Sequence, residues 1–323
     1  MTDTVLAIDL GGTNFRVALM DRAGVVLRKD RQPTRIEEGP DAVIARLIDS
    51  ARGFLRESSP RAIGVAAPGP LDPFSGVILM APNMPGWINV PLRDRLVAAL
   101  GLPCVIDNDA NLAGLGEQRY GAGSHAGANG GRVRNLVYFT VSTGVGGGAI
   151  CDDRLIRGAR GFATEFGYFI LDMNAPAEHA GVPGNLEGMC AGPAIARYTQ
   201  QRLLTGRASQ ILDLAGGIVG QVTARHVSEA ANVGDALALE IVRRTGRILG
   251  YGVINAIHAF DPEIVVLGGS VTLMGELLFQ PLRATVKQFA LAPYRDIPIV
   301  RVALGDDAGL AGAAALAFDA FGQ

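Results

Sequence analysis

Apolar residues recur along this chain with two alternating spacings, one typical of strands and one typical of helices. Residues 5–10 form a short apolar run, the pattern of a strand. Residues 41–57 carry apolar side chains at i, i+3 and i+4, the pattern of a helix packed on a sheet. The same reasoning predicts strands at 15–20, 25–28, 62–67, 75–80, 104–107, 263–267 and 299–302, and helices at 92–100, 110–120, 192–204, 223–232, 235–260, 277–289 and 307–321. Helices layered on strands in both halves indicate an α/β fold.

A glycine turn follows the first strand, which itself carries an acidic residue near its end. Asp9 precedes Gly11, Gly12, Thr13 and Asn14. Because glycine lacks a Cβ, backbone N–H groups can approach polyphosphate oxygens there, and the Thr13 and Asn14 side chains can donate hydrogen bonds. Asp9 can hold hydrated Mg²⁺ beside those oxygens. A Gly-Gly turn also occurs in plain hairpins, so this turn alone leaves both interpretations open.

The same order of strand, glycine turn, strand and short turn recurs at residues 135–157. Ser142, Thr143 and Gly144 occupy the matching bend. An internal duplication of hairpin units, each with a phosphate-type turn, predicts two similar lobes that close on one nucleotide. The hydroxyl groups favour this interpretation, because a purely structural hairpin does not need them.

Asn108 and Asp109 lie between a predicted strand and a predicted helix. A carboxylate at such a place can accept the proton of a substrate hydroxyl. Phosphoryl transfer from ATP needs an aligned alcohol, a base and groups that stabilise the transferring charge. Aspartate is also a favoured helix cap, so Asp109 by itself fits equally well as the cap of a helix that begins at Ala110. The two phosphate-type turns favour the base.

Composition limits the classes of function. The chain has 323 residues, 49% of them hydrophobic, enough for a large core and two domains. Its net charge of −2 gives no electrostatic reason to expect nucleic acid or an anionic membrane surface as a partner. No apolar run reaches the roughly 20 residues of a spanning helix. The first strand begins by Val5, so we expect neither a signal peptide nor a DNA-binding helix pair before it. Three scattered cysteines favour a reducing cytoplasm.

Taken together with other motifs in the same order, these stretches resemble the ROK family of sugar kinases and repressors, which shares the actin and hexokinase ATPase fold. The matching stretches cover nearly the whole chain: 7–13, 67–71, 81–87, 107–111, 142–148, 158–161, 165–167, 187, 192–197, 262–269 and 305–312. The resemblance implies a two-lobed α/β fold with ribonuclease H-like duplicated domains and a cleft between them. We expect an N-terminal lobe at 1–120, completed by the C-terminal helix 305–323, and a larger C-terminal lobe at 121–304.

The resemblance also implies a role for individual residues. Asp109 matches the catalytic base, which takes the proton of a hexose 6-hydroxyl, and Asp9 is expected to position Mg²⁺ through water. The positions that match sugar-binding groups are Gly69, Asn83, Asn108, Glu165, Tyr168 and Glu187. Those that match nucleotide-binding groups are Gly11, Gly12, Thr13, Asn14, Thr143, Gly144, Pro193, Gly268 and Gly269. The alternatives are a solvated charge for the two glutamates and a plain strand-to-helix connector for Gly268 and Gly269.

The chain departs from the family at a structural zinc site. Many members hold zinc with the histidine of Glu-x-Gly-His and three clustered cysteines, but this chain has Tyr168 in the histidine's place and only Cys190 near the cluster. Cys190 and the nearby His179 cannot supply four ligands, so we expect no zinc. Tyr168 either donates its phenol to the sugar or fills the space that the imidazole and metal left, and we favour packing.

The resemblance therefore implies a cytoplasmic hexose kinase that uses ATP and Mg²⁺ to form a sugar 6-phosphate, with glucose as the leading substrate. An amino- or N-acylamino-hexose kinase is the nearest alternative, because the altered loop at Tyr168 leaves recognition near C1 and C2 of the sugar open. A non-catalytic, sugar-responsive regulator is a further alternative, against which Asp109 and both turns argue. We expect a homo-oligomer, a dimer or a tetramer, with no nucleic-acid or membrane partner. The choice between ATP and polyphosphate as donor stays open.

Overall fold

The computed structural model describes residues 3–176 and 181–322. Contacts divide these residues into two compact units. Unit 1 comprises the described residues up to Tyr138, then Gly148–Thr164, and those from Val302 onward. Unit 2 comprises Phe139–Gly147 and the described residues of Glu165–Arg301. The chain thus passes between the units four times, and the first segment of unit 1 continues beyond the boundary at residue 120 that the sequence suggested.

Unit 1 is built on a five-stranded sheet of order β3-β2-β1-β4-β8. Its strands are β1 (Thr4–Leu10), β2 (Asn14–Asp21), β3 (Val26–Pro33), β4 (Ile63–Ala67) and β8 (Cys104–Asn108). The first three form an antiparallel meander, whereas β4 runs parallel to β1 and β8 runs parallel to β4. The carboxyl ends of β1, β4 and β8 therefore lie at one edge of the sheet.

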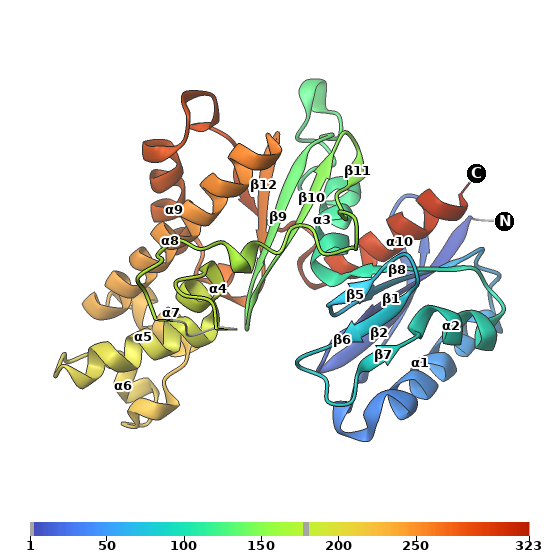
Figure 1. The fold of residues 1–323 in the computed structure, drawn as a ribbon, viewed down its shortest axis with the longest axis horizontal. Helices are drawn as coiled ribbons and strands as arrows, with labels where there is room; N and C mark the ends of the chain where they lie inside the picture. Colours follow the sequence, from blue (N-terminus) through green and yellow to red (C-terminus); the bar gives the residue numbers. More distant parts are fainter. Residues whose placement is uncertain (1–2, 177–180, 323) are drawn as a thin grey trace. The chain divides into compact units, whose positions relative to one another are not determined.

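Helices cover both faces of this sheet, which explains why all seven residues of β1 are buried. Leu6, Ile8 and Leu10 belong to a core formed with α1 (Gly39–Leu55) and α2 (Leu92–Leu100). Val5 and Ala7 point to the opposite face and belong to a second core, formed with α3 (Asp109–Tyr120) and α10 (Ala308–Phe321). Figure 1 shows α1 and α2 on one side of the sheet and α3 and α10 on the other.

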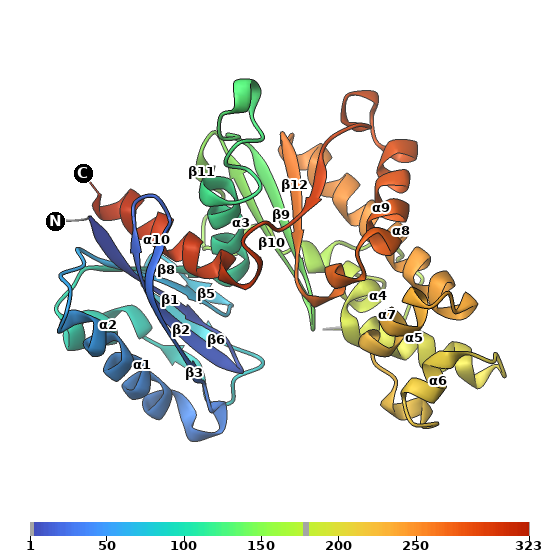
Figure 2. The same cartoon turned by 180° about the vertical axis from the view of Figure 1, so that it is seen from behind.

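The last helix returns to unit 1, where it packs closely on β4 and lies beside α3 (Figure 2 shows α10 and α3). Two glycines make this approach possible. A Cβ on Gly64 of β4 would lie 1.9 Å from the carbonyl oxygen of Ala313, and a Cβ on Gly312 would lie 1.6 Å from that of Leu112. Any side chain at either position would push the helix away from its support.

A small three-stranded sheet completes unit 1, with strands β5 (Leu71–Asp72), β6 (Val77–Met80) and β7 (Ile88–Val90) in that order. It follows the loop after β4, where the Gly69–Pro70 peptide is cis. Trp87, next to β7, is fully buried in the core shared with α1 and α2. Its buried side chain anchors the segment between β6 and β7.

The second sheet repeats the plan of the first, with order β11-β10-β9-β12-β13. Its strands are β9 (Leu136–Val141), β10 (Val145–Cys151), β11 (Arg154–Leu155), β12 (Ile264–Gly268) and β13 (Ile299–Arg301). In both sheets three consecutive strands are followed by two that come later in the chain, and the last two are parallel. The duplication predicted from the two glycine turns is confirmed in this strand order.

The helices of unit 2 are α4 (Leu186–Cys190), α5 (Gly192–Leu204), α6 (Gln210–Leu214), α7 (Ala224–Asn232), α8 (Ala236–Phe260) and α9 (Glu276–Phe289). The long α8 packs on α9, α7 and α4. Side-chain caps explain where two of them begin: Thr223 accepts from the backbone of His226, and Asp235 accepts from that of Ala238. Across the described residues, no helix is long and apolar enough to cross a bilayer.

Candidate functional site

The predicted site residues of unit 1 gather at the carboxyl edge of its sheet. Asp9 on β1 is in register with Ala66 on β4, which is in register with Asp107 on β8. The chain then leaves β4 toward Gly69 and leaves β8 toward Asp109. Open α/β sheets bind ligands at this edge, because loops and helix N-termini converge there.

The turn Gly11–Asn14 is held in one conformation by its own backbone and by a residue that the sequence analysis missed. The Gly11 N–H donates to the Asn14 carbonyl at 3.1 Å. Thr34, which is fully buried, donates through its backbone N–H to Thr13 at 2.9 Å and through its hydroxyl to Gly11 at 2.6 Å. Thr13 itself is exposed. The turn is therefore preformed, with Thr13 available to a ligand.

The structure shows which residue caps α3. The N-cap of α3 is Asn108, whose Oδ1 accepts from the backbone N–H groups of Ala110 at 2.9 Å and Asn111 at 3.3 Å. Asp109 is the first residue of the helix, with an exposed side chain and one oxygen 2.8 Å from the Ala110 nitrogen. The N-cap of the helix is therefore its neighbour, which accepts from two backbone N–H groups of the first turn.

Gly69 and Asn83 lie beside these two segments of unit 1. A Cβ on Gly69 would come 3.1 Å from the side-chain amide nitrogen of Asn108, so the loop after β4 packs against that side chain. A Cβ on Gly12 would lie 3.9 Å from the Asn83 carbonyl oxygen. The phosphate-type turn and the predicted sugar-binding loops are thus neighbours within this unit.

Asp9 is buried and forms an ion pair with Arg16 through its Oδ2. Burial raises the pKa of Asp9, Arg16 opposes that shift, and the charges of Asp307 and Asp306 add to it. No described residue donates a hydrogen bond to its Oδ1, and a Cβ on Gly309 would come within 3.3 Å of the carboxyl group. The space beside the carboxylate therefore suits Mg²⁺, which proteins commonly hold with one or two carboxylates, water and substrate phosphates.

The second phosphate-type turn, Ser142–Gly144, joins three elements of unit 2. Ser142 donates through its backbone N–H to Gly144, and its carbonyl accepts from the Gly192 N–H at the start of α5, both at 2.8 Å. The Ser142 and Ser270 hydroxyls are 3.0 Å apart. Ser270 was missed by the sequence analysis, although it directly follows the predicted Gly268–Gly269 turn.

That Gly268–Gly269 turn lies close to the end of β9. Gly269 has φ of +87°, and a Cβ there would lie 2.4 Å from the Val141 carbonyl oxygen. Pro193, in the first turn of α5, is exposed next to Gly192. The structure therefore brings four predicted nucleotide-binding positions of unit 2 together with the two serines: Thr143, Gly144, Pro193 and Gly269.

Glu165 and Glu187 form a carboxylate pair in unit 2. Burial raises the pKa of Glu165, and the negative charge of Glu187 raises it further. The Oε2 of Glu187 accepts from the Val145 N–H at 2.8 Å, and a Cβ on Gly144 would lie 2.8 Å from the same oxygen. Glu187 therefore contacts the phosphate-type turn. The sequence did not reveal this contact, because α4 and the turn are far apart along the chain. Glu187 is not a solvated surface charge.

The segment that carries Tyr168 is a 3-10 helix, Phe166–Tyr168, followed by an isolated bridge between Ile170 and Asn185. Tyr168 is 48% exposed and does not belong to the buried core. Cys190 is fully buried and contacts the Leu186 carbonyl. Among the described residues, no group of three or more His, Cys, Asp or Glu side chains could hold a metal ion; His179 lies outside them.

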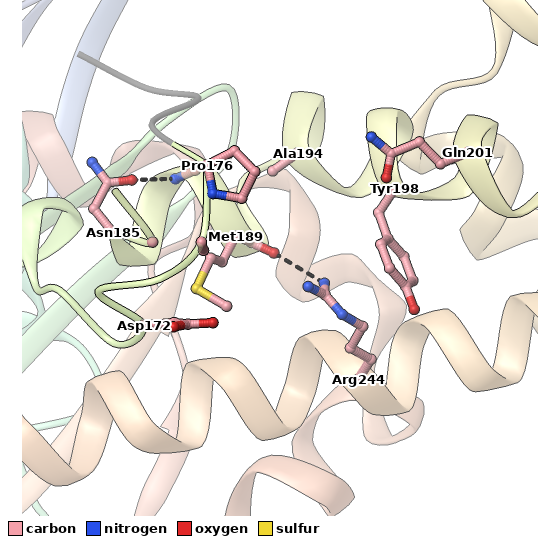
Figure 3. Close-up of a pocket in the computed structure, with 11 residues that line it drawn as sticks. Asp172, Pro176, Asn185, Met189, Ala194, Tyr198, Gln201 and Arg244 are labelled. Atoms are coloured by element: carbon pink, nitrogen blue, oxygen red, sulfur yellow. Dashed lines mark hydrogen bonds between the residues drawn. The ribbon is translucent and has the colours of Figure 1, made fainter. Parts of the chain in front are cut away.

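A separate cavity of about 240 Å³ lies within unit 2 (Figure 3). Arg244 stacks over the Tyr198 ring at 4.0 Å and donates to the Met189 carbonyl, while Asn185 caps α4 through Gly188. The other polar side chains at its wall are those of Asp172 and Gln201. None of the residues predicted for sugar, nucleotide or Mg²⁺ binding lines it.

Similarity to known proteins identifies the family of this chain. The model of the ROK family matches residues 5–320. The chain belongs to the ROK family. It is 34% identical to a glucokinase from Thermotoga maritima, over 97% of this chain and 96% of that protein. It is 28% identical to a xylose repressor from Caldicellulosiruptor bescii, over 97% of this chain and 77% of that protein.

Solved structures of ROK proteins share the fold. A ROK family glucokinase from Streptomyces griseus, solved in complex with glucose and AMPPNP, is 31% identical, with a TM-score of 0.80 and coverage of 98% of this chain and 99% of that one. The two-lobed, actin- and hexokinase-like α/β fold implied by the resemblance is confirmed.

Proposed function

We propose that this protein transfers the γ-phosphoryl group of ATP to the 6-hydroxyl of a hexose, with glucose as the preferred substrate. The single observation that carries the proposal is the placement of Asp109. Its exposed carboxylate begins α3 at the sheet edge that also bears the preformed turn Gly11–Asn14. The similarity to glucokinases, including one solved with glucose and AMPPNP, supports the same reaction.

In the proposed mechanism, Asp109 accepts the proton of the sugar hydroxyl as its oxygen attacks the terminal phosphorus. The other sugar contacts come from Asn108, Asn83, Glu165 and Glu187, with Gly69 letting the loop backbone approach the ring. Amides and carboxylates suit this task, because a sugar with the wrong stereochemistry leaves some of their hydrogen-bonding groups unpaired. Tyr168 is exposed, and it supplies a phenol to the sugar or to the loop around it.

Nucleotide binding is proposed for both glycine turns. In unit 1 the groups are Gly11, Gly12, Thr13 and Asn14; in unit 2 they are Thr143, Gly144, Pro193, Gly268 and Gly269. Backbone N–H groups in such turns bind phosphate oxygens without added charge. Mg²⁺ would be held near Asp9, through water, and would neutralise charge on the phosphates. EDTA should therefore abolish turnover, and added Mg²⁺ should restore it.

A substrate panel tests the proposal. ADP release is measured with ATP and each of glucose, mannose, glucosamine, N-acetylglucosamine and N-acetylmannosamine, and again with polyphosphate in place of ATP. NMR of the product then shows which carbon carries the phosphate. Glucose with the highest kcat/KM and a 6-phosphate product is the expected result. A higher kcat/KM for an amino sugar moves the assignment to the alternative kinase, and binding of sugar without ADP release contradicts the kinase.

The proposal extends to the location, oligomeric state and partners of the protein. A cytoplasmic location without nucleic-acid partners is expected, since the net charge is −2 and the cysteines are free. The family resemblance adds the expectation of a homo-oligomer. Light scattering of the purified protein would give the oligomeric state. A DNA-binding assay would expose a repressor, the activity named for its C. bescii relative.

A further inference from the structure

We propose that a buried network of Arg157, Asp107, Asn111 and Thr164 positions the catalytic segment of unit 1. This inference rests on the proposed function, because it assigns to the network the task of holding Asp109, the proposed base. All four residues of the network belong to unit 1, and none of them was singled out in the sequence as a site residue.

Asp107 is the centre of the network. Its side chain is 1% exposed and lies two residues before Asp109. Its Oδ1 accepts from the Asn108 N–H at 2.8 Å and from the Asn111 side-chain amide at 2.9 Å, and its Oδ2 accepts from Arg157 Nε. Both oxygens are thus engaged, and they fix the turn from β8 into α3 from either side of the base.

Arg157 balances the charge of that buried carboxylate. It lies after β11, 50 residues further along the chain, with 30% of its side chain exposed. A buried carboxylate without a partner is strongly unfavourable, so Arg157 holds the segment after β11 against the end of β8.

Asn111 extends the network to Thr164, the last residue of the second segment of unit 1. Asn111 is 2% exposed, and its Oδ1 lies 3.2 Å from the Thr164 hydroxyl, whose single proton can be donated to Asn111 or to the Ala163 carbonyl at 2.5 Å. Thr164 has φ of +67°, a conformation that is rare for a β-branched residue and persists only when the surroundings hold it. The next residue is Glu165, a proposed sugar ligand. Anchoring Thr164 therefore fixes the backbone immediately before Glu165.

The network thus joins the residues that precede two proposed active groups, the base and a sugar-binding carboxylate. A base must meet the hydroxyl at hydrogen-bonding distance, and a misplacement of about 1 Å can cost roughly 100-fold in rate. We therefore assign these four residues a positioning role, in which they touch neither sugar nor nucleotide.

The first test compares Arg157→Met with Arg154→Met, a matched control at an exposed arginine on β11. We expect Arg157→Met to lower kcat roughly 10- to 100-fold, with the KM for ATP within about threefold of wild type. The double variant Arg157→Met/Asp107→Asn should recover most of kcat. The amide oxygen at position 107 still accepts from the backbone N–H, and no unpaired charge is left buried. A merely structural role would change the unfolding midpoint and leave kcat per folded molecule intact.

The second test uses variants of Thr164 and does not depend on the folding of Arg157→Met. Thr164→Val removes the hydroxyl at constant shape, and Thr164→Ser keeps it. We expect the valine variant to raise the KM for the sugar, and the serine variant to stay near wild type. Equal kinetics for the two Thr164 variants, or wild-type kcat in Arg157→Met, would overturn the network. Absence of hexose phosphorylation by the wild-type protein would instead overturn the proposed function.

Discussion

Replacing Glu117 by glutamine should destabilise unit 1 although the two side chains have nearly the same shape. Glu117 is fully buried on α3, and its carboxylate accepts three backbone hydrogen bonds. The donors are Ala122 at 2.8 Å, Ala303 at 3.0 Å and Leu304 at 2.8 Å. The last two directly follow Val302, where the chain returns to unit 1. The Glu117 carboxylate therefore holds the returning segment, which begins at Val302, against α3.

The magnitude follows from the number of acceptors that are lost. A glutamine oxygen can take the place of Oε2, which accepts from Ala122 and Ala303, but its NH₂ group then faces the Leu304 N–H. One buried donor loses its acceptor, at about 1–3 kcal/mol, and two charge-assisted bonds become neutral ones. We expect a loss of about 2–5 kcal/mol in the free energy of unfolding. An exposed substitution such as Glu37→Gln should change it by less than about 0.5 kcal/mol.

Urea unfolding followed by tryptophan fluorescence measures this loss directly. Trp87 is the only tryptophan of the chain and is fully buried in unit 1, so its emission reports on that unit. The midpoint shift multiplied by the m-value gives the change in free energy. If Glu117→Gln and the Glu37→Gln control unfold at the same urea concentration, the three hydrogen bonds do not hold the returning segment and the reasoning is refuted.

The remaining predictions concern titrating groups. Because the Glu187 charge helps to raise the pKa of Glu165, Glu187→Gln should move the acid limb of kcat/KM for the sugar to lower pH; an unmoved limb would contradict the pairing. Burial raises the pKa of all three thiols, to about 12 for Cys104, but Cys104 and Cys190 are buried and Cys151 is partly exposed, so iodoacetamide should label Cys151 first in the native protein. For Cys104 the unfolded thiol ionises first, near pH 9.0, so its contribution to stability is complete below that pH and is lost toward pH 12, by about 1.4 kcal/mol per pH unit. Unfolding midpoints of wild type and Cys104→Ala across that range check the slope, and parallel curves would contradict it.

Periodicity and capping made most helices predictable. The expected helices at 92–100 and 192–204 match α2 and α5 residue for residue. The α8 helix begins one residue after Asp235, its cap. Apolar spacing and N-caps depend on residues within one or two helical turns of each other, so they can be recognised from the sequence alone. The Phe166–Tyr168 helix was less clear, because three residues are too few to show a period.

The candidate site was predictable only in part, because some of its residues are far apart along the chain. The glycine turns and Asp109 belong to short local motifs, whereas Thr34, Ser270 and Arg157 reach their partners through the fold. Arg157, for example, meets Asp107 across 50 positions of the chain. No spacing rule connects such residues, and only the tertiary fold brings them together. Capping by Asn108 was also hidden, because either residue of the Asn-Asp pair is a favoured N-cap.

The catalytic role of Asp109 is the central claim, and the Asp109→Asn variant tests it most directly. Glucose binding is measured by calorimetry, and formation of glucose 6-phosphate is measured at saturating ATP and glucose. We expect glucose affinity close to wild type and a loss of turnover of roughly 10²- to 10⁴-fold, the usual contribution of a general base. Turnover within a few-fold of wild type would contradict the assignment of Asp109 as the base.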